Sequence, residues 1–339
     1  MNIRKHYIDN LRSYTILVVF LFHVLRLYSM FETFYIHGEE LLATSIIEAI
    51  LSFVMMPLLF AVAGISSRYA LAIRTTGEYV KERVNKLLVP FIFGVLLVVP
   101  IQPYLAQLFR NGDAGYFHSF TRITDLSGYD GAFSIAHLWF PLFLFVISLV
   151  CLPFMVRYKN KGQGTLGDNV PLFCIVLMGL LPAVGSLLDL LGKSPTEFMA
   201  YFLLGFFFLA NDNLLGKLEK YRHLLLGLFI VTAAIVAFVI DRQLYEVPRW
   251  ISVLAVLGYS KRHLDYSGKV GSYLSKASFG VYVFHQSWIV VVAFFVFKVT
   301  SIPLLQIPLV FIVSVILTFA SYEICKRIPV VRWMLGLKR

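Results

Sequence analysis

Charged residues are scarce in this sequence. Asp, Glu, Lys and Arg make up only 14% of its 339 residues, whereas hydrophobic residues make up 59% and the mean hydropathy is +0.78. No water-soluble globular domain has such values, so the composition predicts a polytopic integral membrane protein. The formal net charge of +11 does not indicate a nucleic-acid partner, because the basic residues are dispersed between apolar runs and form no continuous patch.

The usual catalytic signatures are also missing. The sequence contains no H-E-x-x-H, C-x-x-C, G-x-S-x-G, Walker or dinucleotide-binding motif. Metal-dependent hydrolysis, serine-triad chemistry and ATP-driven transport therefore lack their usual signals. The three cysteines, Cys151, Cys174 and Cys325, lie far apart in or beside apolar segments, so we expect packing roles for them and no metal site.

Long apolar runs dominate what is present. Windows of about 18 or more apolar residues predict spanning helices. They are 13–30, 44–66, 87–109, 137–156, 170–191, 221–240, 277–298 and 303–324. Two shorter runs, 198–210 and 245–259, have 13 and 15 residues, near the limit below which a half-spanning segment is the better interpretation.

The distribution of positive charge favours counting the short runs as spans. With ten spans, 23 of the 30 Lys and Arg residues fall on the side that holds both chain ends. Cytoplasmic loops of membrane proteins carry an excess of these residues. We therefore expect an all-α bundle of about ten transmembrane helices with both termini cytoplasmic, forming one transmembrane domain over residues 1–339.

The segment 7–28 carries four polar side chains on one helical face. At about 100° per residue and with Asp9 at zero, Arg12 falls near roughly 300°, His23 near roughly 320° and Arg26 near roughly 260°. His23 lies about 16 Å beyond Arg12 along such a helix, so we expect it near mid-membrane and facing inward. Interfacial roles for Asp9 and Arg12, and a packing role for His23, are the alternatives. Because intramembrane imidazoles are more often functional, His23 is the leading catalytic candidate.

A basic group precedes the predicted span 87–109. Arg68, Arg83 and Lys86 concentrate positive charge at the predicted cytoplasmic mouth of the bundle. Such a group can bind phosphates. The alternative is the ordinary positive charge of an inner loop beside anionic membrane lipid.

Other polar residues lie inside or beside spans. Glu48 can pair with Arg26 or His23, or be a plain interfacial residue. Glu323 is expected to pair with the basic tail that follows it. The loop 110–136 is long for a connector, so an acceptor-binding or lid role stands beside ordinary solvation.

Four motifs, in order along the chain, resemble those of the membrane acyltransferase-3 family. The opening Y-I-D-N-L-R, with a histidine eleven residues after its arginine, is similar to the family's D-x-L-R and first-helix histidine. Arg83 and Lys86 resemble its basic pair before the third helix, although Lys86 stands where arginine is usual. H-L-W-F at 137–140 resembles the entry to a middle helix, and S-F-G-V-Y-V-F-H-Q at 278–286 resembles a late motif. The chain ends look most like the branch that includes periplasmic glucan succinyltransferases.

This resemblance implies a transmembrane O-acyltransferase in the inner membrane of a bacterium. It implies acyl-CoA (acetyl-CoA or succinyl-CoA) as donor and a hydroxyl of an extracytoplasmic glycan or related molecule as acceptor. His23 is the candidate general base or transient acyl carrier, with Asp9 and Arg12 fixing its surroundings; imidazole suits either role because its unperturbed pKa is about 6.5. The candidates for binding donor phosphates are Arg12, Arg68, Arg83 and Lys86, and those for lining the acceptor side or the passage are His137, Trp139, His285 and Gln286.

Two other classes are kept as alternatives. A ten-helix bundle with polar groups at mid-depth also suits a secondary transporter whose histidines relay protons. A lipid-binding or structural membrane protein predicts that neither His23 nor Arg83 matters for any activity. Release of free thiol from acyl-CoA separates the enzyme from the transporter.

Overall fold

The computed structural model describes residues 5–112, 115–161, 166, 170–190, 192–239 and 245–338. Residues 191 and 240, which end two predicted spans, and residues 113–114 of the long loop lie outside the described residues.

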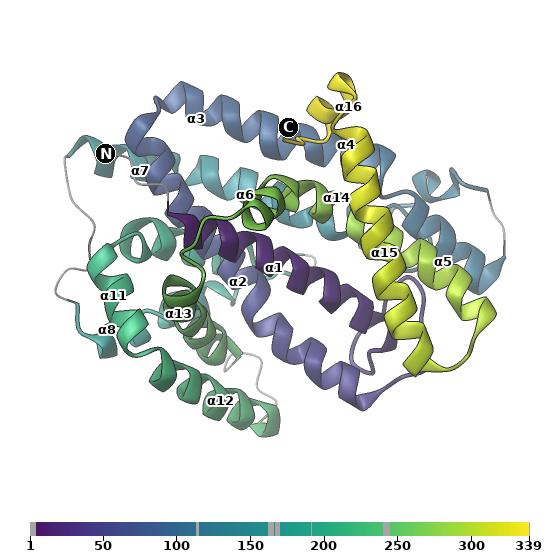
Figure 1. Ribbon diagram of the computed structural model, residues 1–339, viewed down its shortest axis with the longest axis horizontal. Helices are drawn as coiled ribbons and strands as arrows, with labels where there is room; N and C mark the ends of the chain where they lie inside the picture. Colours follow the sequence, from purple (N-terminus) through teal and green to yellow (C-terminus); the bar gives the residue numbers. More distant parts are fainter. Residues whose placement is uncertain are drawn as a thin grey trace. The chain divides into compact units, whose positions relative to one another are not determined.

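Every named element in the described part is a helix (Figure 1), as the hydropathy predicts. The α-helices are α1 (His6–Leu25), α2 (Leu42–Ile73), α3 (Thr76–Arg83), α4 (Val89–Leu97), α5 (Ile101–Asn111), α6 (Trp139–Val150), α7 (Leu152–Asn160), α8 (Leu172–Leu177), α9 (Leu180–Gly185), α10 (Pro195–Leu204), α11 (Asp212–Lys220), α12 (Arg222–Val239), α13 (Glu246–His263), α14 (Lys269–Val299), α15 (Pro303–Cys325) and α16 (Pro329–Met334). The short 3-10 helices are η1 (Arg26–Tyr28), η3 (His118–Thr121) and η4 (Ala136–Leu138), and the π-helical turns are η2 (Val84–Leu88) and η5 (Gly205–Leu209).

Five helical stretches among the described residues are long and apolar enough to cross a membrane. They are His6–Tyr28, Leu42–Ile73, Thr76–Asn111, Lys269–Val299 and Pro303–Cys325. The number rises to seven when two bent helix pairs are each counted as one span. All ten predicted segments overlap helices, but ten full spans with cytoplasmic termini are not confirmed and stay a prediction.

One predicted span is bent and another ends at a bend, and each bend has a local cause. The segment 137–156 bends by 46° between α6 and α7. Pro153 occupies the first turn of α7, where its missing N–H removes a donor to the preceding helix. The segment 198–210 ends where the chain turns by 101° into α11. The Asn211 side chain caps α11 by accepting hydrogen bonds from two of its first backbone amides, so a new helix begins there.

The chain folds into two compact units, each made of three stretches of sequence. The first unit contains Met1–Thr15, Ser52–Arg83 and Phe143–Ser272. The second contains Ile16–Leu51, Val84–Leu142 and Tyr273–Arg339. Several long helices therefore begin in one unit and end in the other.

Within the first unit, α2 packs against the end of α10 through glycines. A Cβ atom on Gly64 would lie 2.0 Å from the carbonyl oxygen of Phe202, and one on Gly205 would lie 2.1 Å from the carbonyl oxygen of Ala61. No side chain fits at such separations. The two backbones meet directly because neither glycine has a Cβ.

The second unit is built around α14, where 72% of the residues in the most apolar stretch of the helix are buried. Gly280 lets the ring of Tyr322 on α15 approach α14, because a Cβ there would lie 2.6 Å from the ring. The Tyr322 hydroxyl donates to the carbonyl of Lys338 at 3.1 Å and holds the C-terminal turn against the helix. The interior of this unit, along α14, contains His23, His137, His285 and Gln286 of the predicted site residues.

Candidate functional site

His23 lies in the last turn of α1. Its Nδ1 atom is 2.8 Å from the carbonyl oxygen of Val19, one turn earlier in the same helix. A carbonyl oxygen only accepts hydrogen bonds, so Nδ1 carries the hydrogen and Nε2 keeps the lone pair of the neutral ring. No described residue hydrogen-bonds to this Nε2. The local helix geometry thus leaves Nε2 as the basic atom of His23.

His285 on α14 contacts His23 directly. Its Nε2 lies 3.2 Å from the Nδ1 of His23, and the two ring centroids are 4.9 Å apart. His285 is buried, and its own Nδ1 is 2.7 Å from the carbonyl oxygen of Tyr282. Residues 23 and 285 are therefore brought together by the packing of the first helix against the helix that carries the late motif.

His137 is the third imidazole of this group. It lies in η4, with its Nε2 donating to the carbonyl of Val283 at 3.0 Å. The Tyr282 hydroxyl donates to the His137 carbonyl, and the His137 and His285 rings are 4.9 Å apart. Since Nε2 donates, Nδ1 carries the lone pair; it is buried and has no hydrogen-bond partner among the described residues. We name His23, His137 and His285 the histidine cluster.

A second polar group extends from α14 to α5. Gln286 donates through Nε2 to Oε1 of Gln102 at 2.9 Å, and Gln102 donates to the Ser287 hydroxyl at 2.8 Å. All three side chains are buried. The Oε1 atom of Gln286 has no hydrogen-bond partner in the described part of the chain. Trp139, the fourth predicted acceptor-side residue, is half-buried, with its ring 6.5 Å from that of Phe140.

Two loops of the second unit meet beside His23. The Phe34 ring lies 6.1 Å from the His23 ring, and the Tyr129 ring lies 6.0 Å from Phe34. Arg110 donates to the carbonyls of Phe34 at 2.7 Å and Tyr129 at 2.6 Å, and so ties the loops together. Burial raises the pKa of the neighbouring Tyr35 phenol well above its ordinary value, so that side chain acts only as a neutral hydrogen-bonding group.

The charges next to the histidine cluster are balanced by ion pairs. Arg26 forms an ion pair with Glu48, which is one of the two pairings predicted for Glu48 from the sequence. It also forms an ion pair with Glu32 at 2.9 Å. Ser29 donates to the second oxygen of Glu48. Glu48 is buried, so its charge is compensated by a partner instead of by water.

The predicted pairing of Glu323 with the basic tail is likewise confirmed, at 2.5 Å to Lys326.

Asp9 and Arg12 form an ion pair in the first unit. The Arg12 NH2 atom lies 3.2 Å from Asp9 Oδ1, and both side chains are partly exposed. His23 lies further along the same helix, in the second unit. The role of Asp9 and Arg12 in fixing the surroundings of His23 stays a prediction.

Two of the predicted phosphate-binding cations, Arg68 and Arg83, belong to the first unit. Arg83 NH2 donates to the Ser67 hydroxyl at 3.2 Å, and the guanidinium lies 4.5 Å from the Tyr79 ring. Arg68, next in sequence to Ser67, has its guanidinium 5.0 and 5.3 Å from two other aromatic rings. Lys86 is exposed in η2 and belongs to the second unit.

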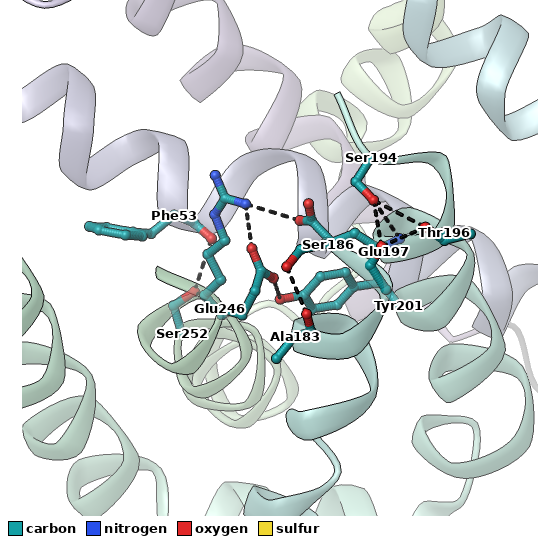
Figure 2. Close-up of polar contacts among 11 residues, drawn as sticks. Phe53, Ala183, Ser186, Ser194, Thr196, Glu197, Tyr201, Glu246 and Ser252 are labelled. Carbon is teal, nitrogen blue, oxygen red and sulfur yellow. Dashed lines mark hydrogen bonds and ion pairs between the residues drawn. The ribbon is translucent and has the colours of Figure 1, made fainter. Parts of the chain in front are cut away.

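Sequence reasoning missed a buried charged cluster in the first unit (Figure 2). Arg249 NH1 donates to Glu246 at 2.6 Å and to Glu197 at 3.1 Å, and the Tyr201 hydroxyl donates to Glu246 at 3.2 Å. The two glutamate side chains are only 2% and 5% exposed. The sequence did mark Glu246 and Arg249 as charged residues inside an apolar segment, which are rare and need partners, but it did not show which residues pair. Of the cysteines, only Cys151 is buried as expected; Cys174 is exposed and Cys325 half-buried.

The comparisons with known proteins agree with the motif pattern. A family model described as an acyltransferase domain, that of the acyltransferase-3 family, matches residues 5–323. No curated protein and no solved structure matches the chain. The matched range covers most of the chain and contains every predicted site residue from Asp9 to Gln286. With its several apolar helices, the chain is a multi-pass membrane protein that belongs to the membrane acyltransferase-3 family.

Proposed function

We propose that this membrane acyltransferase moves an acetyl or succinyl group from cytoplasmic acyl-CoA to a hydroxyl of a glycan or related acceptor on the other side of the membrane. Membership of the family supports acyl transfer. The observation that carries the proposal is the geometry of His23, whose Nδ1 is engaged by the Val19 carbonyl at 2.8 Å while Nε2 keeps its lone pair. An imidazole in that state can take a proton from a hydroxyl group.

In the proposed reaction, His23 Nε2 removes the hydroxyl proton of the acceptor as its oxygen attacks the thioester carbonyl carbon. The new C–O bond forms and the C–S bond breaks. The proton then passes from Nε2 to the departing thiolate, so free CoA thiol leaves and the imidazole returns to neutral. In a second route Nε2 itself attacks the thioester carbonyl carbon, the C–S bond breaks and the CoA thiolate leaves. The acceptor hydroxyl then attacks the acyl group carried on Nε2, the C–N bond breaks, and the hydroxyl proton passes to the thiolate. General-base assistance of this kind is worth about 10² to 10⁴ in rate.

Donor binding is assigned to four cations. We propose that Arg12, Arg68, Arg83 and Lys86 bind the phosphates of CoA. Guanidinium groups match phosphate oxygens in a two-pronged geometry, which lysine cannot reproduce. The Arg83 guanidinium, held by Ser67 and the Tyr79 ring, is already restricted in orientation, so binding would cost it little further rotamer freedom.

Acceptor binding is assigned to His137, Trp139, His285 and Gln286. The buried His137 Nδ1 and Gln286 Oε1 atoms are hydrogen-bond acceptors without a partner among the described residues. Hydroxyl groups of a sugar are donors that can satisfy both atoms. Trp139 offers an apolar ring face beside them. The proposal places the chain in the inner membrane of a bacterium, with ten spans, both termini cytoplasmic and membrane lipid around it.

A proton-coupled transporter is the second candidate function. The observation that favours it is the continuous contact of three imidazoles in the histidine cluster, because such rows relay protons in membrane carriers. A transporter would leave acyl-CoA intact.

Thiol release tests the proposal. The purified protein in detergent is incubated with acetyl-CoA or succinyl-CoA, with and without cell-envelope glycans, and free thiol is measured. We expect release by the wild type and none by His23→Ala. The matched control is His223→Ala, which removes a histidine whose ring bonds only to the Tyr259 hydroxyl in the described contacts. Equal release by His23→Ala and the wild type would refute the role of His23, and no release by either would favour the transporter.

A further inference from the structure

The contact between His23 and His285 has a definite hydrogen-bond direction. Each ring faces a backbone carbonyl through its Nδ1, at 2.8 Å from Val19 for His23 and at 2.7 Å from Tyr282 for His285. A carbonyl repels a nitrogen lone pair at these distances, so both Nδ1 atoms carry hydrogens. In a neutral ring the other nitrogen is then an acceptor. The 3.2 Å contact is therefore a hydrogen bond donated by His23 Nδ1 to His285 Nε2.

This direction has a consequence for the orientation of His23. The Val19 carbonyl alone selects which nitrogen carries the hydrogen, but one partner on the same helix leaves the ring free to tilt. The second partner is on α14, and it restrains the ring from the opposite helix. With Nδ1 shared between two acceptors, Nε2 points away from both of them.

We infer that His285 is a positioning residue, which accepts the Nδ1 hydrogen of His23 and thereby holds His23 Nε2 toward the reacting hydroxyl. This inference rests on the proposed function and gives His285 a second role beside the proposed acceptor-side one. It assigns His285 the place that a carboxylate takes in a nucleophile–histidine–acid triad, filled here by a neutral imidazole.

A neutral partner also suits the charge change in the reaction. When Nε2 takes the hydroxyl proton, His23 becomes a cation and its Nδ1–H becomes a stronger, charge-assisted donor to His285. His285 can strengthen this bond without bringing a negative charge into the apolar interior, where an unpaired carboxylate is costly. The His137 ring also packs against the His285 ring, with centroids 4.9 Å apart, and limits its movement.

Three substitutions at position 285 separate positioning from packing. The Oε1 atom of glutamine reaches about as far along the side chain as the Nε2 of histidine, so His285→Gln keeps an acceptor beside His23. Asparagine is one bond shorter and reaches only as far as Nδ1, so His285→Asn keeps polarity but loses the bond. Alanine removes both. Because supporting hydrogen-bond partners commonly contribute 10- to 100-fold, we expect His285→Ala and His285→Asn to lower kcat by about that factor, with KM for acyl-CoA unchanged.

His285→Gln should restore most of the lost kcat, which a purely packing role would not predict. The inference is overturned if His285→Ala keeps the wild-type kcat, if its loss lies wholly in KM, or if asparagine rescues as well as glutamine. His223→Ala is again the control for loss of a histidine as such.

A spectroscopic measurement makes the test independent of the proposed reaction. In full-length protein with ¹⁵N-labelled histidine, we expect His23 Nδ1 to be the protonated ring nitrogen and to show scalar coupling to His285 Nε2 across the hydrogen bond. The coupling should be lost in His285→Ala. If the wild type releases no thiol from any acyl-CoA, the proposed function fails. The coupling measurement still shows whether His23 Nδ1 donates a hydrogen bond to His285 Nε2. Absence of the coupling in active wild-type protein overturns the inference alone.

Discussion

Removing Arg249 should destabilise the protein far more than neutralising Glu197. Arg249 is the shared cation of the buried cluster, where it contacts both Glu246 and Glu197; the two glutamates are labelled in Figure 2. The substitution Arg249→Met keeps the length and apolar stem of the side chain but leaves two buried carboxylates facing each other without a cation. Glu197→Gln removes one negative charge and leaves one carboxylate matched to one guanidinium.

The magnitude follows from the distances. At an effective dielectric constant of about 20, Coulomb's law assigns each contact of 2.6 or 3.1 Å an attraction of about 5 to 6 kcal/mol before desolvation. Burial of the two glutamates offsets much of this attraction, and breaking a buried pair by removing one partner commonly costs about 3 to 5 kcal/mol. We expect Arg249→Met to fall in that range and Glu197→Gln to cost about 1 kcal/mol or less. Glu246→Gln should lie between them, because Glu246 makes the shorter contact and also accepts from Tyr201.

Thermal unfolding in detergent, followed by tryptophan fluorescence, measures these differences. In a chain of this size a change of 1 kcal/mol shifts the midpoint by roughly 2 °C or less. Arg249→Met should therefore unfold several degrees below Glu197→Gln. The reasoning fails if Arg249→Met unfolds at the wild-type temperature, or if Glu197→Gln is as unstable as Arg249→Met.

Two further predictions concern packing and pH. Gly205→Ala should lower the unfolding temperature strongly, by the overpacking cost of about 1 to 3 kcal/mol or more, because its Cβ would lie 2.1 Å from a backbone oxygen; the control Gly227→Ala, with open space at its Cβ, should be neutral or stabilising. Hydrogen bonds from Ser127 lower the pKa of Asp125 in the folded protein. The ionised carboxylate therefore stabilises its loop fully at pH values above the unfolded-state pKa of about 3.9, and this stabilisation is lost as the pH falls through the lower pKa of the folded state. Cleavage of that loop by an acid protease should therefore increase at low pH in the wild type, and Asp125→Ala should be cleaved readily across the whole range; identical pH profiles would contradict this account.

Much of the site was visible in the sequence as separate residues. His23 stood out because an ionisable group inside an apolar helix is costly and needs a reason. His137 and His285 stood out through the motifs around them, and the pairing of Glu48 with Arg26 was one of the expected alternatives. Arg68 and Arg83 were assigned to one basic group; both belong to the first unit, and their joint role in binding phosphates stays a prediction.

Other features could not be predicted from a single amino-acid sequence. The cluster of Glu197, Tyr201, Glu246 and Arg249 joins residues about fifty positions apart, and no local pattern links them. The Gln102 side chain, which bonds to Gln286 from α5, looked like an ordinary residue of a span. The bend at residue 211 depends on a side-chain cap whose strength the hydropathy profile does not register.

Composition and periodicity alone determined that this chain is a helical membrane protein with an imidazole inside its first helix. Unpaired backbone groups and charges are costly in lipid whatever the tertiary structure, so this cost can be read from the sequence. Only the tertiary structure decided that the Nδ1 atom of His23 has a second partner in the Nε2 atom of His285. Hydrogen-bond direction depends on which atoms lie within about 3 Å of each other, and residues 262 positions apart reach that distance only when the helices that carry them pack together.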